Sequence, residues 1–543
     1  MTLLKNKKFL LFAFCLISLL AYYPARNAGI VTDFLGWLYK YKEGSYADVI
    51  NCFGYVGHHQ FFHLINYSIF KTIGVSHFGW YFIFALFHGL NGYLLYLLSE
   101  RWFNRWEIKL PYASIFIALL FLLSPYQVET LTWKACFHYI MSVGLCLSGF
   151  LYLLRYLERA NRRDLIIVHI LFLCALFTLE INLATPFIYL LFILADYYRN
   201  PKGELKNKVF HVFLVQFVFI VLYFLLNKFS LGEWVGHYGE DDHLNFSPDL
   251  IFGNGLKHFF KHVFLLHYFP FAIKEFVYTA LGNAKVFVPI ILILLGVLGF
   301  VIKRFKSLSG PFQISSTSLV MFFMGIFPIV NLFFMYVIQH ENDRYSYFAM
   351  PFFCIAIVSI LYKLKFVPRY TILTLYLIIH MVLLSSMVKN ARFAGEGCKA
   401  LLENFPCERA EGKRVYFLAI PDNFNGMYMY RDFGEYTTSF KESMDLLYDP
   451  TCENVDYRTV AQYNFKYPSD IINAYFETED RVRVFIGQNG TWFWKDGIGL
   501  SDYETENFKV VNKGWYFTVT FKDLSVKPLL LYPHGGEWKI LEY

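Results

Sequence analysis

The sequence predicts a polytopic α-helical membrane protein followed by a C-terminal extracytoplasmic domain of α+β or mostly β structure. Hydrophobic residues make up 56% of its 543 residues, and charged residues only 17%, against about 25% in an ordinary soluble domain. These proportions exclude a soluble cytoplasmic enzyme, a disordered chain and a small disulfide scaffold. The apolar blocks end near residue 390, so we expect a transmembrane domain at 1–390 and a soluble domain at 391–543.

The apolar blocks have the length that membrane-spanning helices need. A span takes about 20 mainly apolar residues to cross ~30 Å of hydrocarbon. The first block follows Lys5, Lys7 and Lys8 and has no clear cleavage site behind it, which favours a retained anchor over a cleaved signal peptide. Eleven spans are predicted, at residues 9–24, 78–98, 110–124, 135–154, 165–179, 183–198, 209–228, 286–302, 315–336, 347–362 and 370–388.

The distribution of Lys and Arg predicts the orientation. With the N-terminus inside, the inner loops are basic, whereas the short outer loops carry only Lys134 and Arg344. Eleven spans then place the tail outside, in what we expect to be a bacterial inner membrane. Segment 256–273 combines three His and two Lys with apolar residues, which predicts an amphipathic helix lying in the outer interface. As a twelfth span it would reverse the orientation of everything after it.

Two long outer loops, 25–77 and 229–285, indicate that the outer face carries the function. In the first loop, residues 33–41 predict a short helix lying flat on the bilayer, because Trp37 and Leu38 continue an apolar face. Asp33 would begin this helix, and a carboxylate at a helix N-terminus stays ionised and can accept a proton.

Charged residues gather at the outer ends of the spans, where charge is costly and by default functional. Carboxylates beside an arginine suit an anionic phosphate ligand and a proton-accepting base. The candidates are Asp33 after the first span, Glu129 after the third, Glu180 after the fifth, and His340, Asp343 and Arg344 after the ninth. Simpler explanations stay open: Glu129 could pair with Lys134, Arg344 could pair locally with Asp343, and His63 and its neighbours could be interface histidines.

Five short motifs follow one another along the chain. They are Asp33 after the first span, Phe78 to His88 and Asn91, Ser124-Pro125 through Glu129 to Trp133, Glu180 to Pro186, and Asp343-Arg344-Tyr345-Ser346-Tyr347. Their order and spacing resemble the GT-C superfamily of integral-membrane glycosyltransferases. The chain is most similar to the branch of transmembrane O-mannosyltransferases that carry TPR repeats, and to their bacterial relatives. The resemblance covers about residues 10–365.

This resemblance implies inverting transfer of a sugar from a polyprenyl-phosphate donor to a hydroxyl on a glycan, lipid or protein acceptor. Asp33 and Glu129 would be catalytic, and Arg344 would bind the donor phosphate. The resemblance leaves open whether a divalent metal takes part, and it implies no nucleic-acid partner. The residues implied to position donor or acceptor are Glu180, Asp343, His340, Tyr345 and His63.

The chain also departs from the family pattern. Phe34 stands where a second acid is common, His59 to His63 replaces an Arg-Pro pair, and Cys136 to Tyr139 replaces an Arg-x-Asp step. No 34-residue helical repeat is present. Two alternatives therefore stay open: a non-catalytic relative that supports envelope assembly, and a transporter or flippase of a lipid-linked sugar, which would favour broken or charged helices at mid-membrane.

The tail predicts a module of about 145 residues behind a helical linker at 389–404. Its role is open between a structural lid and acceptor binding. Cys398, Cys407 and Cys452 allow one disulfide with one cysteine left over. Strands are predicted at 412–421, 427–430, 481–486, 491–494, 508–511, 515–521 and 528–531, and helices within 434–475.

Overall fold

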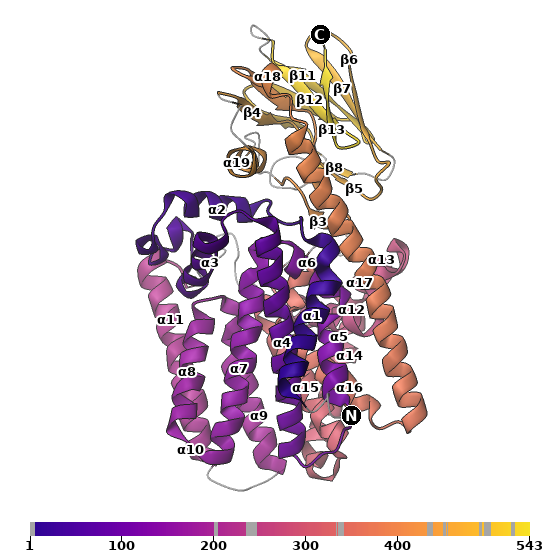
Figure 1. The fold of residues 1–543 in the computed structure, drawn as a ribbon. Helices are drawn as coiled ribbons and strands as arrows, with labels where there is room; N and C mark the ends of the chain where they lie inside the picture. Colours follow the sequence, from indigo (N-terminus) through magenta and orange to yellow (C-terminus); the bar gives the residue numbers. More distant parts are fainter. Residues whose placement is uncertain are drawn as a thin grey trace.

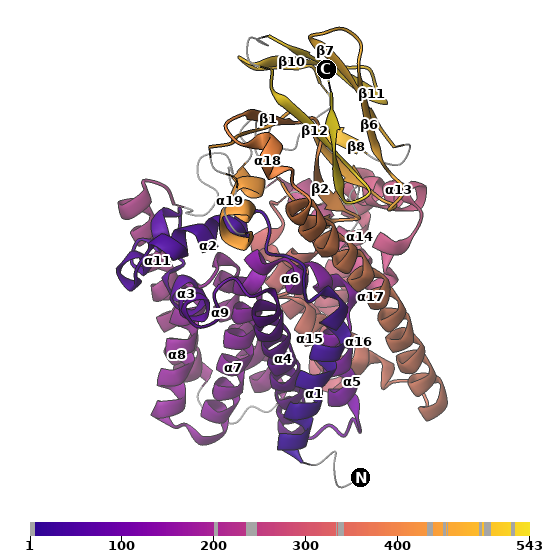
Figure 2. The same cartoon turned by 45° about the horizontal axis from the view of Figure 1, so that its top comes forward.

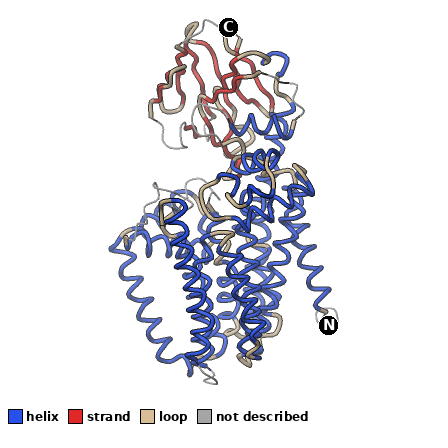
Figure 3. The backbone as a smooth tube through the Cα atoms, turned by 90° about the vertical axis from the view of Figure 1, so that its left-hand side faces the viewer, coloured by secondary structure: helices blue, strands red, loops and turns tan. Residues whose placement is uncertain are grey.

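The computed structural model shows a bundle of helices with a sheet-rich unit at one end (Figures 1 and 3). The helices of the bundle, in chain order, are α1 (Lys7–Tyr22), α4 (His77–Arg105), α5 (Ala113–Leu122), α7 (Phe137–Arg159), α8 (Arg162–Leu176), α9 (Thr185–Arg199), α11 (Val215–Leu231), α14 (Ala284–Arg304), α15 (Gly310–Ile326), α16 (Met350–Leu361) and α17 (Phe366–Glu403). The structure describes residues 6–199, 205–234, 247–332, 334, 342–431, 438–448, 452, 454–487, 491–493, 501–522 and 527–542.

A helix lies at each of the eleven predicted spans, but fewer have the length of a span. Within the described ranges, eight helices, some lengthened by adjoining helical turns, are long and apolar enough to cross a membrane. A ninth would be α5 joined to the segment Pro125–Thr132, with a bend of 48° between them. The helices α8 and α16 have 15 and 12 residues, which is short for a straight span.

The last span continues out of the bundle as one helix. α17 has 38 residues, roughly 57 Å at 1.5 Å per residue, and it ends beneath the strands (Figure 1). The linker predicted at 389–404 is therefore the C-terminal part of the same helix, which ends at Glu403. Its buried residues Ala391, Ala394 and Gly395 let other backbone approach closely, since a Cβ at Gly395 would lie 2.8 Å from Ala28 Cα.

Short helices lie across the end of the bundle that faces the sheet-rich unit (Figures 1 and 2). The predicted flat helix is α2 (Asp33–Glu43), which buries Phe34, Leu35, Leu38 and Tyr41. Next to it lies α3 (Gln60–Ile73). Of the two, α2 contacts the sheet-rich unit, through α19 (Thr438–Leu447).

The predicted interfacial helix at 256–273 is found in a different setting. It is split into α12 (Gly255–Phe264), a turn at 266–268, and the start of α13 (Phe271–Gly282). The polar residues His258, Lys261 and His262 of α12 are at most 4% exposed. The predicted amphipathic helix is therefore shorter than expected, and the protein itself covers its polar face.

The sheet-rich unit contains three sheets. The first has the order β13-β12-β1-β4, with β1 parallel to both neighbours; the second is antiparallel, β6-β7-β11-β10-β9; the third is β3-β2-β5-β8. α19 (Thr438–Leu447) packs against α2 below it. The strands are β1 (Arg414–Phe417), β2 (Ile420–Phe424), β3 (Met427–Tyr428), β4 (Asp456–Thr459), β5 (Gln462–Phe465), β6 (Ile472–Phe476), β7 (Arg481–Ile486), β8 (Thr491–Phe493), β9 (Tyr503–Glu504), β10 (Phe508–Asn512), β11 (Tyr516–Phe521), β12 (Leu529–His534) and β13 (Glu537–Leu541).

One detail of the predicted tail is corrected. The strand expected at 412–421 is two strands, β1 and β2, which belong to different sheets. The region 434–475 contains a helix as predicted, α19, and also the strands β4, β5 and part of β6.

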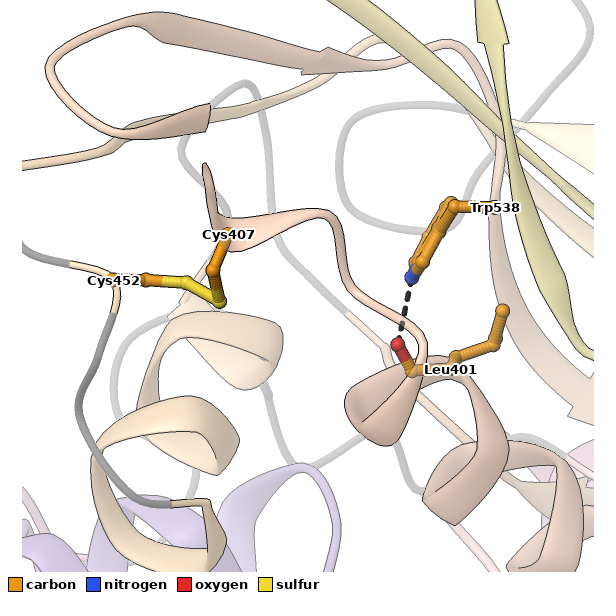
Figure 4. Close-up of a disulfide and its surroundings, with 4 residues drawn as sticks. All are labelled: Leu401, Cys407, Cys452 and Trp538. Atoms are coloured by element: carbon orange, nitrogen blue, oxygen red, sulfur yellow. Dashed lines mark hydrogen bonds between the residues drawn. A yellow bond between two sulfur atoms is a disulfide. The ribbon is translucent and has the colours of Figure 1, made fainter. Parts of the chain in front are cut away.

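A disulfide joins Cys407 to Cys452, 45 residues apart (Figure 4). Cys398 is the cysteine left over, buried as a free thiol. Close to the disulfide, Trp538 Nε1 of β13 donates a hydrogen bond of 2.7 Å to the Leu401 carbonyl. The end of α17 is therefore tied to the C-terminal strand of the chain.

Candidate active site

Asp33 is held at the start of α2 by a tightly packed loop. The Lys134 N–H donates to the Gly29 carbonyl at 3.0 Å, and Trp133 Nε1 donates to the Thr32 hydroxyl at 2.9 Å. Gly29 has φ +87°, and a Cβ there would lie 1.5 Å from the Thr132 carbonyl oxygen. Only glycine fits this approach. The loop before Asp33 is thus fixed to the segment that ends at Trp133.

The Asp33 carboxyl is open to solvent but surrounded by protein. Partial dehydration raises its pKa above the usual value for aspartate, and the positive charges of Arg344 and Arg431 oppose this rise. Asp33 is therefore a reachable carboxylate whose proton affinity is set by its surroundings, with two arginines close enough to act on it.

Glu129 lies in α6 (Val128–Thr132), is 2% exposed, and binds the short segment 342–344. Its carboxylate accepts hydrogen bonds from the backbone N–H of Arg344 at 2.7 Å and of Asn342 at 3.2 Å. It also forms a salt bridge with the Arg344 guanidinium. The simpler expectation of a pair with Lys134 is wrong, because Lys134 Nζ donates to the Leu131 carbonyl at 2.8 Å.

The Arg344 guanidinium lies between aromatic rings. Its central carbon is 4.9 Å from the Trp133 ring centroid and 4.6 Å from that of Tyr345. Its Nη2 donates to the Tyr345 hydroxyl at 3.2 Å, and its Nη1 donates to the Tyr428 hydroxyl at 3.3 Å. The side chain is 14% exposed. Stacking and hydrogen bonds thus fix the guanidinium plane while one part stays accessible.

Asp343 forms a buried ion pair with a residue of α12. Lys261 Nζ lies 2.6 Å from its carboxylate, and both side chains are 1% exposed. His267 Nδ1 lies 3.3 Å from the same oxygen. The sequence left open a local pair between Asp343 and Arg344. In the structure Asp343 pairs with Lys261 instead, and Arg344 pairs with Glu129. The ion pair with Asp343 explains the burial of Lys261 on the polar face of α12.

Glu180 and His63 belong to other groups. Glu180 accepts a hydrogen bond from the Tyr223 hydroxyl at 3.2 Å and lies 3.6 Å from His59 Nε2. His63 in α3 bonds the Tyr41 hydroxyl at 2.7 Å. Burial lowers the pKa of His63 to about 3, so it is neutral at physiological pH. Its ring packs against Trp37 of α2, which suits support of that helix, and His340 lies outside the described residues.

Other motif residues form a buried network deeper in the bundle. His88 Nδ1 lies 2.8 Å from the Tyr347 hydroxyl, and His88 Nε2 lies 3.2 Å from the Leu122 carbonyl. The carbonyl can only accept, so Nε2 carries the proton and Nδ1 accepts from Tyr347. Asn91 Nδ2 donates to the Ile140 carbonyl at 2.9 Å. These motif residues join helices to one another.

Two residues near Arg344 were missed by sequence reasoning. Tyr428 and Arg431 come from the sheet-rich unit, and the only signal for either was the predicted strand at 427–430. Among the described residues, no group of three or more His, Cys, Asp or Glu side chains could hold a metal ion. The resemblance left open whether a metal takes part, and the described residues offer no candidate ligand set for one.

Comparisons with known proteins find structural matches but no match by sequence. No family model and no curated protein matches the sequence. A solved structure that is similar is the cryo-EM structure of the arabinofuranosyltransferase AftD from mycobacteria, with 10% sequence identity and a TM-score of 0.43. The match covers 95% of this chain and 40% of AftD, so this chain spans about two fifths of that protein's length.

Proposed function

We propose that this chain is an inverting membrane glycosyltransferase that moves a sugar from a polyprenyl-phosphate donor to an acceptor hydroxyl. The observation that carries the proposal is the convergence of Asp33, Trp133 and Arg344 at the end of the bundle beneath the sheet-rich unit. These residues come from separate segments of the chain. Arg344, for example, lies 215 positions after Glu129, to which it is bonded. An exposed carboxylate under the influence of a fixed arginine offers a base and an anion partner in one place.

In this reaction Asp33 removes the proton from the acceptor hydroxyl. The hydroxyl oxygen then forms a bond to the anomeric carbon, and the bond from that carbon to the donor phosphate oxygen breaks. Negative charge develops on the leaving phosphate, which Arg344 stabilises. A positioned general base contributes about 10²–10⁴ in rate. We assign Glu129 to positioning Arg344, because its carboxylate already binds three donors of residues 342–344.

An apolar groove supports a donor with a lipid tail. A cavity of about 300 Å³ is lined by residues of α12, α14 and α15 and the segment before α12. Leu256 of α12 lines it, and Lys261, five residues later, pairs with Asp343 beside Arg344. Five residues of helix span roughly 7.5 Å. The groove therefore shares α12 with the lysine that pairs with Asp343. Other lining residues include Leu294, Leu298, Leu319, Phe323 and Val330.

The reaction would take place outside the cytoplasm. The disulfide between Cys407 and Cys452 supports this side, because disulfides form and persist in oxidising compartments. The basic inner loops support the same orientation. We therefore place the sheet-rich unit and Asp33 on the outer face of a bacterial inner membrane.

The test is sugar transfer by the purified full-length protein from a polyprenyl-phosphate sugar to a panel of acceptors. Wild type is compared with Asp33→Asn, and with Glu396→Gln as a control that alters an exposed carboxylate paired with Arg392. We expect Asp33→Asn to reduce transfer by about 10²-fold or more, and Glu396→Gln to behave as wild type. Near wild-type transfer by Asp33→Asn would refute its role as the base.

The same protein in sealed vesicles separates the alternatives. Movement of a lipid-linked sugar across the bilayer without transfer would identify a flippase. Neither movement nor transfer, across the panel of donors and acceptors, would favour a non-catalytic assembly role.

A further inference from the structure

The sheet-rich unit contacts the candidate active site through β3. The Tyr428 ring lies 4.4 Å from the Trp133 ring, centroid to centroid, and its hydroxyl accepts from Arg344 Nη1 at 3.3 Å. Beside it, Met427 Sδ accepts a weak hydrogen bond from the Thr132 hydroxyl at 3.9 Å. The unit therefore rests on the same segment, 132–133, that fixes the loop before Asp33.

A second arginine lies on the Tyr428 ring. The central guanidinium carbon of Arg431 is 4.7 Å from the ring centroid, and the side chain is 21% exposed. Asp422, which is fully buried, accepts from Arg431 Nε at 2.5 Å and from Nη2 at 2.9 Å. Such a bidentate pair fixes the orientation of the guanidinium plane.

Arg344 and Arg431 thus both contact Tyr428, Arg344 at its hydroxyl and Arg431 over its ring. Each is held by a buried carboxylate, Glu129 for one and Asp422 for the other, and each touches the tyrosine. One arginine belongs to the helical bundle and the other to the sheet-rich unit. The charges of both act on the Asp33 carboxyl and oppose the rise of its pKa.

We propose that Arg431 and Arg344 together bind a phosphate group of the substrate, so that the active site is shared between the bundle and the sheet-rich unit. This inference rests on the proposed function. Arginine suits the role because its planar fork matches phosphate oxygens and because it keeps its charge when partly buried. An arginine used only for docking would need no exposed surface, whereas about a fifth of the Arg431 side chain is exposed.

The phosphate could come from the lipid-linked donor or from a phosphorylated acceptor. Binding is therefore measured on the full-length protein in detergent with undecaprenyl phosphate, with undecaprenol as the uncharged control, and with inorganic pyrophosphate as a soluble anion. The variants are Arg431→Gln, Arg431→Lys and Arg344→Gln. The matched control is Arg409→Gln, which removes an exposed arginine paired with Glu542 in the same unit.

We expect Arg431→Gln to raise the Kd for a phosphate probe about tenfold or more, the typical effect of losing a charge-assisted hydrogen bond. Undecaprenol binding and the Arg409→Gln variant should be unchanged. A loss confined to undecaprenyl phosphate would assign the site to the donor, and a loss confined to pyrophosphate would assign it to an acceptor phosphate. Either result supports the inference.

Wild-type affinity of Arg431→Gln for both probes, with affinity lost in Arg344→Gln, would overturn the inference and leave the proposed function intact. Conversely, phosphate binding that depends on Arg431 in a protein that transfers no sugar would refute the proposed function alone. If Arg431→Gln does not fold, Arg431→Lys decides. Lysine keeps the charge opposite Asp422 but cannot present the fork, so unchanged affinity in that variant would overturn the inference.

Discussion

The indole nitrogen of Trp133 donates a hydrogen bond of 2.9 Å to the hydroxyl of Thr32, the residue immediately before Asp33. Thr32 has φ 53° and ψ −134°, a conformation that L-residues rarely adopt and that costs of order 1–3 kcal/mol. The bond therefore stabilises a strained residue whose only evident task is to aim the start of α2. Because the Trp133 ring also packs on Arg344, this one side chain aligns the proposed base, Asp33, with the arginine proposed to bind the phosphate.

Replacing this tryptophan tests the alignment. We expect Trp133→Phe to keep a ring beside Arg344 but to lose the bond to Thr32, at a cost to stability of about 1 kcal/mol. Transfer should fall about tenfold, because small displacements of a reacting group reduce rates steeply. Transfer rates and thermal unfolding measured side by side check this. A rate that falls only in proportion to the unfolded fraction would contradict it.

The pH dependence of transfer should report Asp33. Asp33 must be ionised to accept a proton, so the rate falls as the pH drops through its pKa. Partial dehydration raises that pKa above the usual aspartate value, which places the acid limb of the profile at higher pH than for a free aspartate. Arg431→Gln removes a charge that lowers the pKa, so the limb should move to higher pH still.

The measurement is kcat/KM across a pH series for wild type, Arg431→Gln and Arg409→Gln. The last should give the wild-type profile, since its arginine pairs with Glu542 at the surface. An acid limb that is identical in all three proteins would assign the titration to another group.

Much of the helical framework could be predicted from sequence because burial in lipid leaves a long apolar run for each span. Asp33 and Arg344 could be singled out as candidates for a related reason, since charges at the ends of such runs stand out. The setting of α12 could not be found. The sequence of a helix with His258, Lys261 and His262 on one face is the same whether that face meets water or a buried carboxylate. Only the tertiary fold places Asp343 against Lys261.

The contribution of the sheet-rich unit was hidden for another reason. Tyr428 lies in a two-residue strand, and Arg431 in the chain that follows it, so neither carries a periodic signal. Their position at Arg344 depends on how α17 and α19 place the unit on the bundle. Likewise, the run 412–421 gives no sign that β1 and β2 enter different sheets, because pairing between distant strands leaves no local pattern.

The close approach at Gly29 predicts a sharp sensitivity. Gly29→Ala should destabilise the protein by about 3 kcal/mol or more, because the new Cβ would overlap the Thr132 carbonyl oxygen and the φ of +87° disfavours alanine. Gly232→Ala is the matched control. That residue has φ +81° with nothing within 4 Å, so it should cost only about 1 kcal/mol. Equal shifts in thermal unfolding would mean that the clash is relieved by movement of the loop.

The disulfide should stabilise the sheet-rich unit. Cys407 and Cys452 close a loop with a sequence separation of 45 residues. A disulfide of this kind typically contributes about 2–4 kcal/mol to the free energy of unfolding. Cys452→Ser should therefore lower the unfolding midpoint of this unit and expose it to protease. Reducing agent should shift wild type to the same midpoint and leave Cys452→Ser unchanged. A further shift of the variant on reduction would point to another bond.

Glu129→Gln separates two roles for this carboxylate. The substitution keeps the shape of the side chain but removes the charge that pairs with Arg344, and it turns one acceptor oxygen into a donor facing the N–H groups of residues 342 and 344. If Glu129 holds Arg344 in place, the donor should bind more weakly, with a KM raised about tenfold or more, and the acid limb set by Asp33 should remain. If Glu129 were the base, kcat would instead fall by about 10² or more at unchanged donor KM, and the acid limb would disappear.

Glu403→Gln, which alters an exposed carboxylate paired with Lys399, is the matched control and should leave both constants unchanged. Because Arg344 would lose its buried partner, thermal unfolding must be measured in parallel, and a loss of about 3 kcal/mol or more is the expected effect of breaking such a pair.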